Sequence, residues 1–309
     1  MRPRYDELSL LPGTDLRHAW DLFGAGDALG TLNLLTEERR REAASLVRTG
    51  ATVNLSLPLT EPEPPPFGRL PLQHEFFPTT AFSWDDRITR LDMQASSQWD
   101  GLLHVRHREF GFYGGRHSDP TPGDKLGIDR WVEHGIVGRG VLLDVERHFR
   151  RLGREYDPLA PVAVSAAELR SIAQAQGVEL REGDILLIRF GWPAAYARTD
   201  PAARDAMAAR PTCSGLYAGE AMARFLWDTG IAAVACDNPS VEVQPGDREH
   251  GYLHHRLLTM LGMPMGELFA LDAVAERCAQ ARVWEFLFVS VPLNVPGAVG
   301  SPANAVAVL

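Results

Sequence analysis

The sequence predicts an α/β fold, a single domain in which helices flank a mixed β-sheet. Strand-like segments gather in the first half of the chain, and helix–strand pairs fill the second half. Ser165 and Glu168 form a capping box before a helical pattern that stops at Gly177, and Gly183–Phe190 is typical of a buried strand. Helices and strands do not alternate strictly, so a doubly wound parallel sheet is not expected.

The other elements follow from periodicity and composition. The proline run Glu61–Pro66 (EPEPPP) indicates a stiff, extended loop that makes an exposed excursion. The segment Gly111–Asp124, rich in glycine, proline and aromatic residues, indicates a further loop. Strands are expected at Ala51–Leu59, Arg87–Ser96, Gly140–Val145, Ile231–Cys236 and Trp284–Val291, and helices at Glu37–Val47, Tyr217–Asp228, Tyr252–Leu261 and Leu271–Ala281.

The composition disfavours several classes of protein. The chain has 309 residues and a formal net charge of −9, whereas binding to nucleic acid or to anionic membranes would need a basic face. No apolar run approaches the roughly 18 residues of a membrane span, and the N-terminal sequence is not that of a signal peptide. The 3 cysteines are widely spaced, which indicates neither a disulfide framework nor a zinc finger. We therefore expect a cytoplasmic enzyme that acts on a small molecule.

The first candidate site is the segment Gln98–His107, which carries an amide, a carboxylate and imidazoles within a short stretch. These groups are ligands for divalent metals of intermediate hardness. His104 and His107 alternate imperfectly for a strand, so only one of them need point into a site. The alternative is structural: Asp100 caps a turn with Gly101, and the histidines lie on the surface.

His250, His254 and His255 form a second cluster, and Glu267 follows it. On one helix His250 and His254 would share a face at i, i+4, a spacing that zinc sites use. His255 is interpreted as a solvated helix residue. If the helix ends near Gly262 and the chain turns back, His254 and Glu267 can meet. The sequence has no HExxH, GxSxG, P-loop or dinucleotide-binding motif.

Several motifs resemble those of the cyclase family that contains kynurenine formamidase-like proteins and isatin hydrolase, in its QWDGLxH variant. The first is Ser97–Val105 (SQWDGLLHV), which Phe112–Gly115 (FYGG) follows. The resemblance runs from about Trp20 to the C-terminus. Its other motifs are Gly127–Asp129, Gly138–Asp144, Gly183–Trp192, Ala235–Pro239, His254–Leu258, Gly262–Glu267 and Pro292–Asn294.

This resemblance implies a swivelling β/β/α fold and a metal-activated water that opens an amide or a lactone. We expect one domain over residues 1–309, with an N-terminal extension of about residues 1–35. Better-known members hold the metal through His-x-Gly-Thr-His-x-Asp, and this sequence departs from that motif. If Gln98 replaces the first histidine, His104 replaces the aspartate. In a register shifted by two residues, Asp100 and His104 take the two histidine positions and Arg106 replaces the aspartate.

The expected metal is a divalent ion, Zn²⁺ or Mn²⁺, held by Asp100, His104, His254 and Glu267. His107, His254 and Glu267 are the candidates that move protons during catalysis. His255 remains an alternative to His254, one residue out of register.

Substrate contacts are expected from a separate group of residues, and two of them have a structural alternative. Arg189 and Asp237 would orient the polar end of the substrate, or else form a salt bridge and a turn cap. The full group is Gln98, Trp99, Tyr113, Arg189 and Asp237.

The expected activity is hydrolysis of a small cyclic or aryl amide, at a C–N bond other than a peptide bond, or of a lactone. One alternative is a natural-product cyclase or dehydratase that uses the same pocket, and another is a metal-free small-ligand-binding protein. We also expect a homo-oligomer, a dimer or a tetramer. The closing strand Trp284–Val291 is long and apolar, and the segment up to Leu35 has little core of its own.

Overall fold

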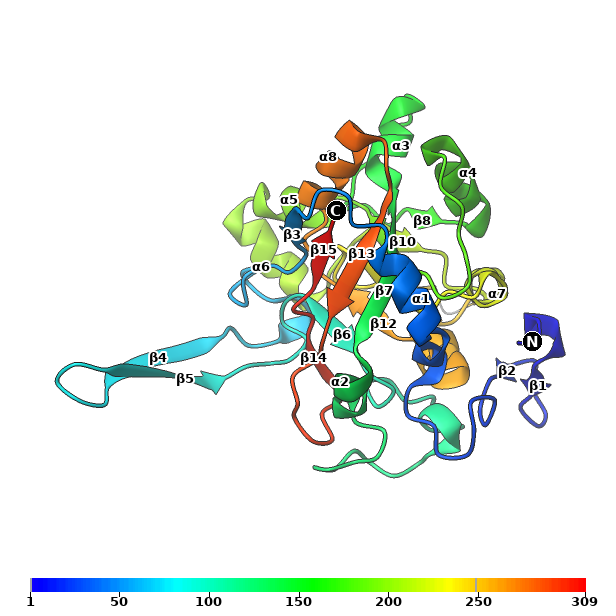
Figure 1. Ribbon diagram of the computed structural model, residues 1–309, viewed down its shortest axis with the longest axis horizontal. Coiled ribbons are helices and arrows are strands. Elements are labelled where there is room, and N and C mark those ends of the chain that lie inside the picture. The colour runs from blue at the N-terminus through cyan, green and yellow to red at the C-terminus, as the bar shows by residue number, and fades with distance from the viewer. Residues whose placement is uncertain (1, 248) are drawn as a thin grey trace.

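The computed structural model describes residues 2–247 and 249–309. Within this part of the chain a nine-stranded mixed sheet forms the centre, with helices on both faces (Figure 1). Four central strands run parallel, and the outer strands on either side are antiparallel. This arrangement confirms the predicted α/β fold. From one edge to the other, the strands are β14 (Gly300–Pro302), β6 (Gln98–Asp100), β12 (Met265–Glu267), β11 (Ala233–Cys236), β9 (Ile185–Arg189), β7 (Ile136–Asp144), β13 (Glu285–Ser290), β15 (Val306–Val308) and β3 (Thr52–Asn54).

The helices and short elements connect these strands. The capping box predicted at Ser165 and Glu168 is present, and Gly177 ends that helix in the left-handed conformation. No helix in the described ranges is long and apolar enough to cross a bilayer. The helices are α1 (Glu37–Ala44), α2 (Trp131–His134), α3 (Val145–Arg151), α4 (Ala166–Gln176), α5 (Trp192–Ala197), α6 (Pro201–Ala209), α7 (Glu220–Thr229), α8 (Asp272–Ala281) and the π-helix η6 (His255–Leu261). The 3₁₀ turns are η1 (Tyr5–Glu7), η2 (Gly30–Leu34), η3 (Pro66–Gly68), η4 (Tyr113–Gly115) and η5 (Ile128–Arg130), and two-stranded pairs form between β1 (Ser9–Leu10) and β2 (Arg17–His18) and between β8 (Ala163–Val164) and β10 (Gly215–Leu216).

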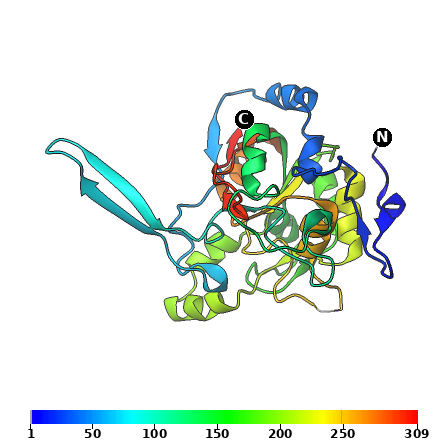
Figure 2. The same cartoon turned by 90° about the horizontal axis from the view of Figure 1, so that it is seen from below.

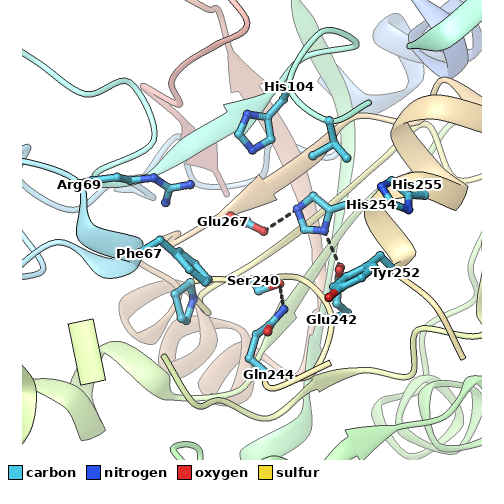
Figure 3. A pocket seen from close by; sticks show the side chains of 12 residues that line it. Phe67, Arg69, His104, Ser240, Glu242, Gln244, Tyr252, His254, His255 and Glu267 are labelled. Carbon is cyan, nitrogen blue, oxygen red and sulfur yellow. Dashed lines mark hydrogen bonds and ion pairs between the residues drawn. The ribbon is translucent and has the colours of Figure 1, made fainter. Parts of the chain in front are cut away.

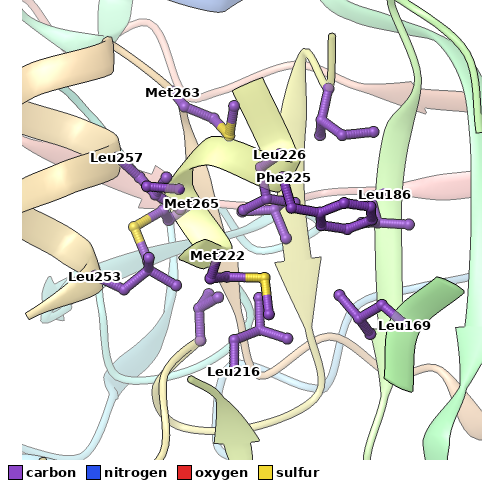
Figure 4. Packing of buried hydrophobic residues seen from close by; sticks show 14 of the residues in the cluster. Leu169, Leu186, Leu216, Met222, Phe225, Leu226, Leu253, Leu257, Met263 and Met265 are labelled. Atoms are coloured by element: carbon purple, nitrogen blue, oxygen red, sulfur yellow. The ribbon is translucent and has the colours of Figure 1, made fainter. Parts of the chain in front are cut away.

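Both faces of the sheet are buried, because side chains alternate along its central strands. On one face Leu186 and Ile188 of β9 belong to a core with α3, α4, α7 and η6, part of which Figure 4 shows. On the other face Ile185 and Leu187 pack in a second core with η2, α2 and α8. The site described below lies where the first of these faces meets β6 and β12.

The two reasons for expecting a homo-oligomer are wrong, although the oligomeric state itself stays a prediction. The closing strand β13 lies inside the sheet, between β7 and β15, and Phe286 and Phe288 are buried within the same chain. The N-terminal segment also has partners of its own, since Tyr5 and Leu8 pack into the first core. Neither segment leaves a large apolar surface open.

The strand predicted at Arg87–Ser96 differs most from the structure. The strand is β5 (Trp84–Arg90), which pairs with β4 (Gln73–Pro78) in a hairpin that stands away from the body (Figures 1 and 2). We call residues 73–90 the arm. The chain returns from the arm to the body before it reaches β6.

Candidate functional site

Two neighbouring strands carry the polar centre of the site. β6 and β12 pair antiparallel, with Gln98 opposite Glu267 and Asp100 opposite Met265. Because side chains alternate along a strand, Gln98, Asp100 and Glu267 point to one face of the sheet. All three are buried, and the Gln98 Nε2 donates to Glu267 Oε2 at 2.9 Å. The pairing therefore places an amide and two carboxylates side by side.

Trp99 lies between the two polar residues of β6 and points to the opposite face. Its indole is fully buried, donates from Nε1 to Ser290 Oγ at 2.9 Å, and packs edge-on against Phe269 and Phe288. The two-residue period of the strand thus separates Trp99 from its polar neighbours, and Trp99 does not line the cavity described below. Trp99 instead anchors β6 in the second core.

His254 supplies an imidazole to the same centre. Its Nε2 lies 3.2 Å from Glu267 Oε1 and 3.8 Å from Asp100 Oδ2. Its Nδ1 lies 2.6 Å from Glu242 Oε2 and donates to that carboxylate. The helix ends at Gly262, which adopts the left-handed conformation, and the chain turns back as predicted. This turn brings His254 and Glu267 together.

The Asp100 carboxylate has buried oxygens that accept no hydrogen bond from the described residues, and Gln98 Oε1 is in the same condition. The nearest basic side chains to Asp100 are His104, with Nε2 at 3.6 Å, and His254, with Nε2 at 3.8 Å. A buried carboxylate without compensating hydrogen bonds or a close cation costs several kcal/mol. Oxygens in this condition are suited to bind a cation directly.

The charges of the cluster follow from burial and proximity. Burial acts to raise the pKa of Asp100, but attraction from His104 and His254 outweighs it and leaves that pKa below its usual value. Burial, with repulsion from Asp100, raises the pKa of Glu267 to about 7. Burial opposes a charge on His254, yet attraction from Glu242 and hydrogen bonds to the carboxylates hold the His254 pKa well above its usual value. The centre therefore concentrates negative charge and retains protons to offset it.

Three of the four predicted metal ligands come together. One ligand atom each from Asp100, His254 and Glu267 lies within 4.8 Å of the others. A tetrahedral ion with bonds of about 2.1 Å separates its ligand atoms by about 3.4 Å, close to the 3.2 Å and 3.8 Å measured at His254 Nε2. The Glu242 carboxylate lies behind His254 and accepts its Nδ1–H. A carboxylate in this position fixes the ring orientation and the tautomer of a metal-binding histidine. These residues fit a divalent ion, whereas His104 stands beside the group.

The cluster borders a cavity of about 330 Å³ (Figure 3). Figure 3 shows Phe67 and Arg69 on one side of this cavity and Tyr252 and His255 on the other, with Glu267 between them. The cavity therefore combines two aromatic walls with a polar floor.

Arg69 contributes a positive charge to the cavity wall. Its Nη1 donates to the carbonyl oxygen of Gln94 at 2.7 Å, and its guanidinium lies 5.2 Å from the ring centre of Phe67. Phe67 has a φ of 62°, which is uncommon for a bulky residue. Backbone strain of this kind clusters at ligand sites, so it supports a binding role for this wall.

Comparison with known proteins decides the family. The family model described as "Putative cyclase" matches residues 53–243, more than half of the chain. The chain belongs to the cyclase family. A crystal structure described as a novel cyclase is 32% identical with a TM-score of 0.81, and the match covers 94% of this chain and 99% of that chain. No curated protein matches the sequence.

More distant members of the comparison share the fold of this cyclase-family chain. Isatin hydrolase A from Labrenzia aggregata, bound to benzyl benzoate, is 16% identical with a TM-score of 0.59, and the match covers 86% of this chain and 94% of that chain. Isatin hydrolase A from Ralstonia solanacearum is 15% identical with a TM-score of 0.57, and the match covers 86% of this chain and 93% of that chain. These matches confirm the resemblance found in the sequence.

Several residues that the fold brings to the cavity were not predicted from the sequence, among them Glu242, Phe67, Arg69 and Tyr252. Glu242 lies between Val241 and Val243, and an acidic residue that interrupts a short apolar run was the available signal. Phe67 and Arg69 follow the proline run, which was interpreted only as an exposed loop. Nothing in the pattern of that segment points to a cavity, because its position depends on the fold of the whole chain.

Two predicted site residues lie outside the cavity. The Nδ1 of His107 accepts backbone N–H bonds from residues two and three positions further along the chain, at 3.2 Å and 3.3 Å. Its ring stacks on Phe110, and His107 does not line the cavity. Tyr113 is buried, with its hydroxyl 3.3 Å from Asp27 Oδ2. Tyr113 does not line this cavity either.

Arg189 and Asp237 make the contacts of the structural alternative, a salt bridge and a turn cap. The Arg189 guanidinium forms ion pairs with Asp144 at 3.0 Å and Asp272 at 2.7 Å. Asp237 accepts the backbone N–H of Phe190 at 2.7 Å and that of the next residue at 2.8 Å. These contacts tie together the ends of β9 and β11, and neither residue lines the cavity.

The remaining histidines of the second cluster also differ from expectation. His255 is half-buried and lines the cavity, with its ring 5.6 Å from that of Tyr252, so the interpretation as a solvated residue is wrong. His250 pairs with Asp247 at 2.7 Å, ahead of the helix. The i, i+4 pair of His250 with His254 therefore does not form.

Proposed function

We propose that this cyclase-family protein is a metal-assisted hydrolase that opens a small cyclic or aryl amide, or a lactone. In the amide case the bond is a C–N bond other than a peptide bond. The observation that carries the proposal is the cluster of Asp100, His254 and Glu267, whose ligand atoms lie within 4.8 Å of one another. Two of its members, His254 and Glu267, line a cavity, and Glu242 supports the histidine from behind.

Each residue of the centre has a role that its position supports. Asp100, His254 and Glu267 would hold Zn²⁺ or Mn²⁺, which lowers the pKa of a bound water and polarises a carbonyl. Glu242 keeps the His254 ring oriented with Nε2 toward the two acids. His104 lines the cavity 3.6 Å from Asp100, and from there it delivers a proton to the leaving group.

The cavity walls define the class of substrate. Phe67 and Tyr252 present aromatic faces on opposite sides, which suits a planar ring. Arg69 offers N–H groups to the carbonyl oxygen of the substrate, where negative charge develops as the carbon becomes tetrahedral. A volume of about 330 Å³ lies at the lower end for ligand pockets. A compound of one or two rings is the best match.

Metal loading and turnover test this proposal together. Protein purified without chelator should carry close to one divalent ion per chain, measured by elemental analysis. It should hydrolyse at least one compound from a panel of formanilides, cyclic imides and lactones. Chelation should abolish turnover, and Zn²⁺ or Mn²⁺ should restore it. A fully loaded protein that hydrolyses nothing on the panel contradicts the proposal.

Product analysis separates hydrolysis from the two alternatives. Ring closure or loss of water, in place of hydrolysis, would identify a natural-product cyclase or dehydratase. A protein that takes up no metal and binds panel compounds without converting them would be a small-ligand-binding protein. Isotope labelling with H₂¹⁸O gives the sharpest distinction, because only hydrolysis places the label in the product.

A further inference from the structure

A groove rich in arginine lies apart from the candidate metal centre, beside the helices α3, α4 and α8, which Figure 1 shows at the same end of the molecule. It consists of two adjoining hollows of about 490 Å³ and 340 Å³. Gln176, Arg282 and Trp284 line both hollows, and we call the surface around them the arginine groove. The groove shares no lining residue with the cavity of the metal centre.

Positive charge dominates the arginine groove, although the whole chain has a formal net charge of −9. Six arginines and two glutamates line it. Two of the arginines, Arg139 and Arg147, each pair with two acidic residues at 2.6–3.1 Å, which neutralises them. Arg181 lies 3.7 Å from Glu179, and both of these side chains are exposed. The excess of positive charge therefore comes from the other three arginines.

These three guanidinium groups have no acidic partner. Within residues 2–247 and 249–309, the side chains of Arg48, Arg151 and Arg282 form no ion pair and no hydrogen bond. Arg48 lines one hollow, Arg151 lines the other, and Arg282 lines both. Cations that come together without a counter-ion repel one another. The groove is therefore suited to receive an anion.

The backbone of Arg282 supports a binding role independently of its charge. Arg282 has a φ of 55° and ends α8 in the left-handed conformation, which glycine usually adopts at this position. A residue with a Cβ costs free energy there. Strain of this kind clusters at ligand sites. The chain thus keeps an unfavourable conformation at the arginine that lines both hollows.

Stabilisation of helix ends is the alternative explanation for the three arginines. The partial negative charge at a helix C-terminus attracts a cation within the last turn, and Arg151 and Arg282 stand at the ends of α3 and α8. Arg48 does not fit this explanation, because α1 already ends at Ala44. The attraction also does not explain why arginines of three separate segments meet around one groove.

We propose that the arginine groove binds a small anion that carries two linked phosphate groups. The planar guanidinium group donates two parallel N–H bonds to phosphate oxygens, a geometry that favours arginine at phosphate sites. Two hollows that meet at Arg282 match two phosphates, one toward Arg48 and the other toward Arg151. The acidic remainder of the chain would repel a long polyanion such as nucleic acid. This binding is independent of the reaction at the metal centre.

Isothermal titration calorimetry of the full chain with inorganic pyrophosphate tests the proposal. The wild type should bind one pyrophosphate per chain, and more weakly as the ionic strength rises, because salt screens exposed charges. Arg151→Met/Arg282→Met should raise the Kd at least about 10-fold, through the loss of charge-assisted hydrogen bonds. Arg198→Met is the matched control, since Arg198 is exposed at the C-terminus of α5 but lies outside the groove. It should bind as the wild type.

Two further ligands define the anion. Inorganic phosphate should bind at least about 10-fold more weakly than pyrophosphate, because it fills only one of the two positions. Equal affinity for the two ligands contradicts a site for two linked phosphates. Adenosine diphosphate distinguishes the sources of the diphosphate: tighter binding than pyrophosphate supports a metabolite that carries the group, and weaker binding supports the free ion.

Hydrogen exchange locates the bound anion, which matters because pyrophosphate can also bind a metal ion. Pyrophosphate should slow the exchange of backbone amides in residues 147–151 and 279–285, and should leave residues 254–267 unchanged. Protein that has been stripped of metal by a chelator and then dialysed should bind pyrophosphate as tightly as before. Protection confined to residues 254–267 would place the anion at the metal centre and overturn the proposal.

Arg282→Gly separates anion binding from stabilisation of the helix end. Glycine fits the left-handed conformation, so the melting temperature without ligand should not fall, whereas the Kd for pyrophosphate should rise at least about 10-fold. A lower melting temperature with unchanged affinity identifies Arg282 as a helix cap alone and overturns the proposal. A wild type that binds no pyrophosphate at roughly 1 mM in low salt does the same.

Discussion

The metal centre and the arm place polar and apolar groups in opposite ways. At the centre, the Asp100 carboxylate is fully buried with no hydrogen bond among the described residues. In the arm, Phe76 and Trp84 are more than two-thirds exposed with no core to cover them. Each arrangement is costly in an isolated chain. A bound cation would remove the cost at the centre, and a covering surface would remove it in the arm.

The difference teaches how to separate function from folding in this molecule. The strands that carry the centre are fixed inside a large sheet, so changes there affect both chemistry and stability. The strands of the arm pair only with each other, so changes there are expected to leave the stability of the body almost unchanged. Substitutions can therefore be chosen that affect one region and leave the other unchanged.

The largest expected effect is on the metal centre itself. His254→Ala should lower both metal content and kcat/KM by about 1,000-fold or more, because loss of a ligand exceeds the 10–100-fold cost of losing its outer partners. Elemental analysis and steady-state kinetics measure the two quantities. His250→Ala is the control, since His250 pairs with Asp247 outside the cavity. Full metal content in His254→Ala would remove His254 from the ligand set.

Two tryptophans compare the regions directly. Trp99→Ala should lower the free energy of unfolding by about 3–5 kcal/mol, because it empties a packed site between Phe269 and Phe288. Trp84→Ala in the arm should change the free energy of unfolding by less than about 0.5 kcal/mol, because Trp84 is 69% exposed. Urea denaturation measures both. Equal losses would mean that the arm is part of the fold of its own subunit.

Asp237 is also a buried carboxylate, but unlike Asp100 it accepts hydrogen bonds from backbone N–H groups. Burial raises its pKa to about 7 in the folded chain, so the folded state holds the proton more tightly than the unfolded state. This contribution to the free energy of unfolding is fully present below about pH 4 and is lost as the pH rises through about 7. Its size is up to about 4 kcal/mol. Asp237→Asn should remove that part of the pH dependence of urea denaturation. If the pH dependence of stability is the same in Asp237→Asn as in the wild type, the raised pKa of Asp237 is contradicted. Metal loading should not alter this pH dependence.

Arg69→Met tests the role of the cavity wall in catalysis without changing the proposed metal ligands. Removal of one donor to a developing oxyanion costs about 100-fold or more in kcat, and we expect this loss with metal content unchanged. KM should change little, because the interaction strengthens as the reaction proceeds. Arg106→Met serves as the control, since Arg106 pairs with the exposed Asp119. A change confined to KM would assign Arg69 to ordinary substrate binding.

The smallest effect is expected from the residue behind the histidine. Glu242→Gln keeps the shape of the side chain but weakens the bond to His254 Nδ1, which should reduce metal affinity by about 10-fold. Competition with a chelator of known affinity measures this shift. If metal affinity is unchanged while stability falls, Glu242 has only a structural role.

The parts of the fold with long, simple patterns were predictable from the sequence. The apolar run Gly183–Phe190 became β9, and the capping box at Ser165 became the start of α4. The arm was not predicted, although its strands are amphipathic, because their apolar face has no core of this chain to meet. Local patterns indicate which side chains avoid water, but they do not indicate which surface will cover them.

The same limit explains the mixed result at the site. His254 and Glu267 were predictable because a single turn at Gly262 joins their segments. Gln98 and Glu267 are 169 residues apart, and only the order of strands in the sheet brings them together. Glu242 and Arg69 enter the site in the same way from segments without a metal-binding pattern. Trp99 lies on the other face of β6 from Gln98 and Asp100, which a shared motif does not indicate.

The position of β6 has a consequence for the order of assembly during synthesis. β6 is held on one edge by β12 and on the other by β14, so Trp99 pairs with Gly266 and with Ser301. Protein synthesis begins at the N-terminus, and early segments must wait for later ones. The strand that carries Gln98 and Asp100 therefore leaves the ribosome long before either of its neighbours has been made. On the proposed ligand set, capture of an ion would be a late event, which follows translation of residues 265–267.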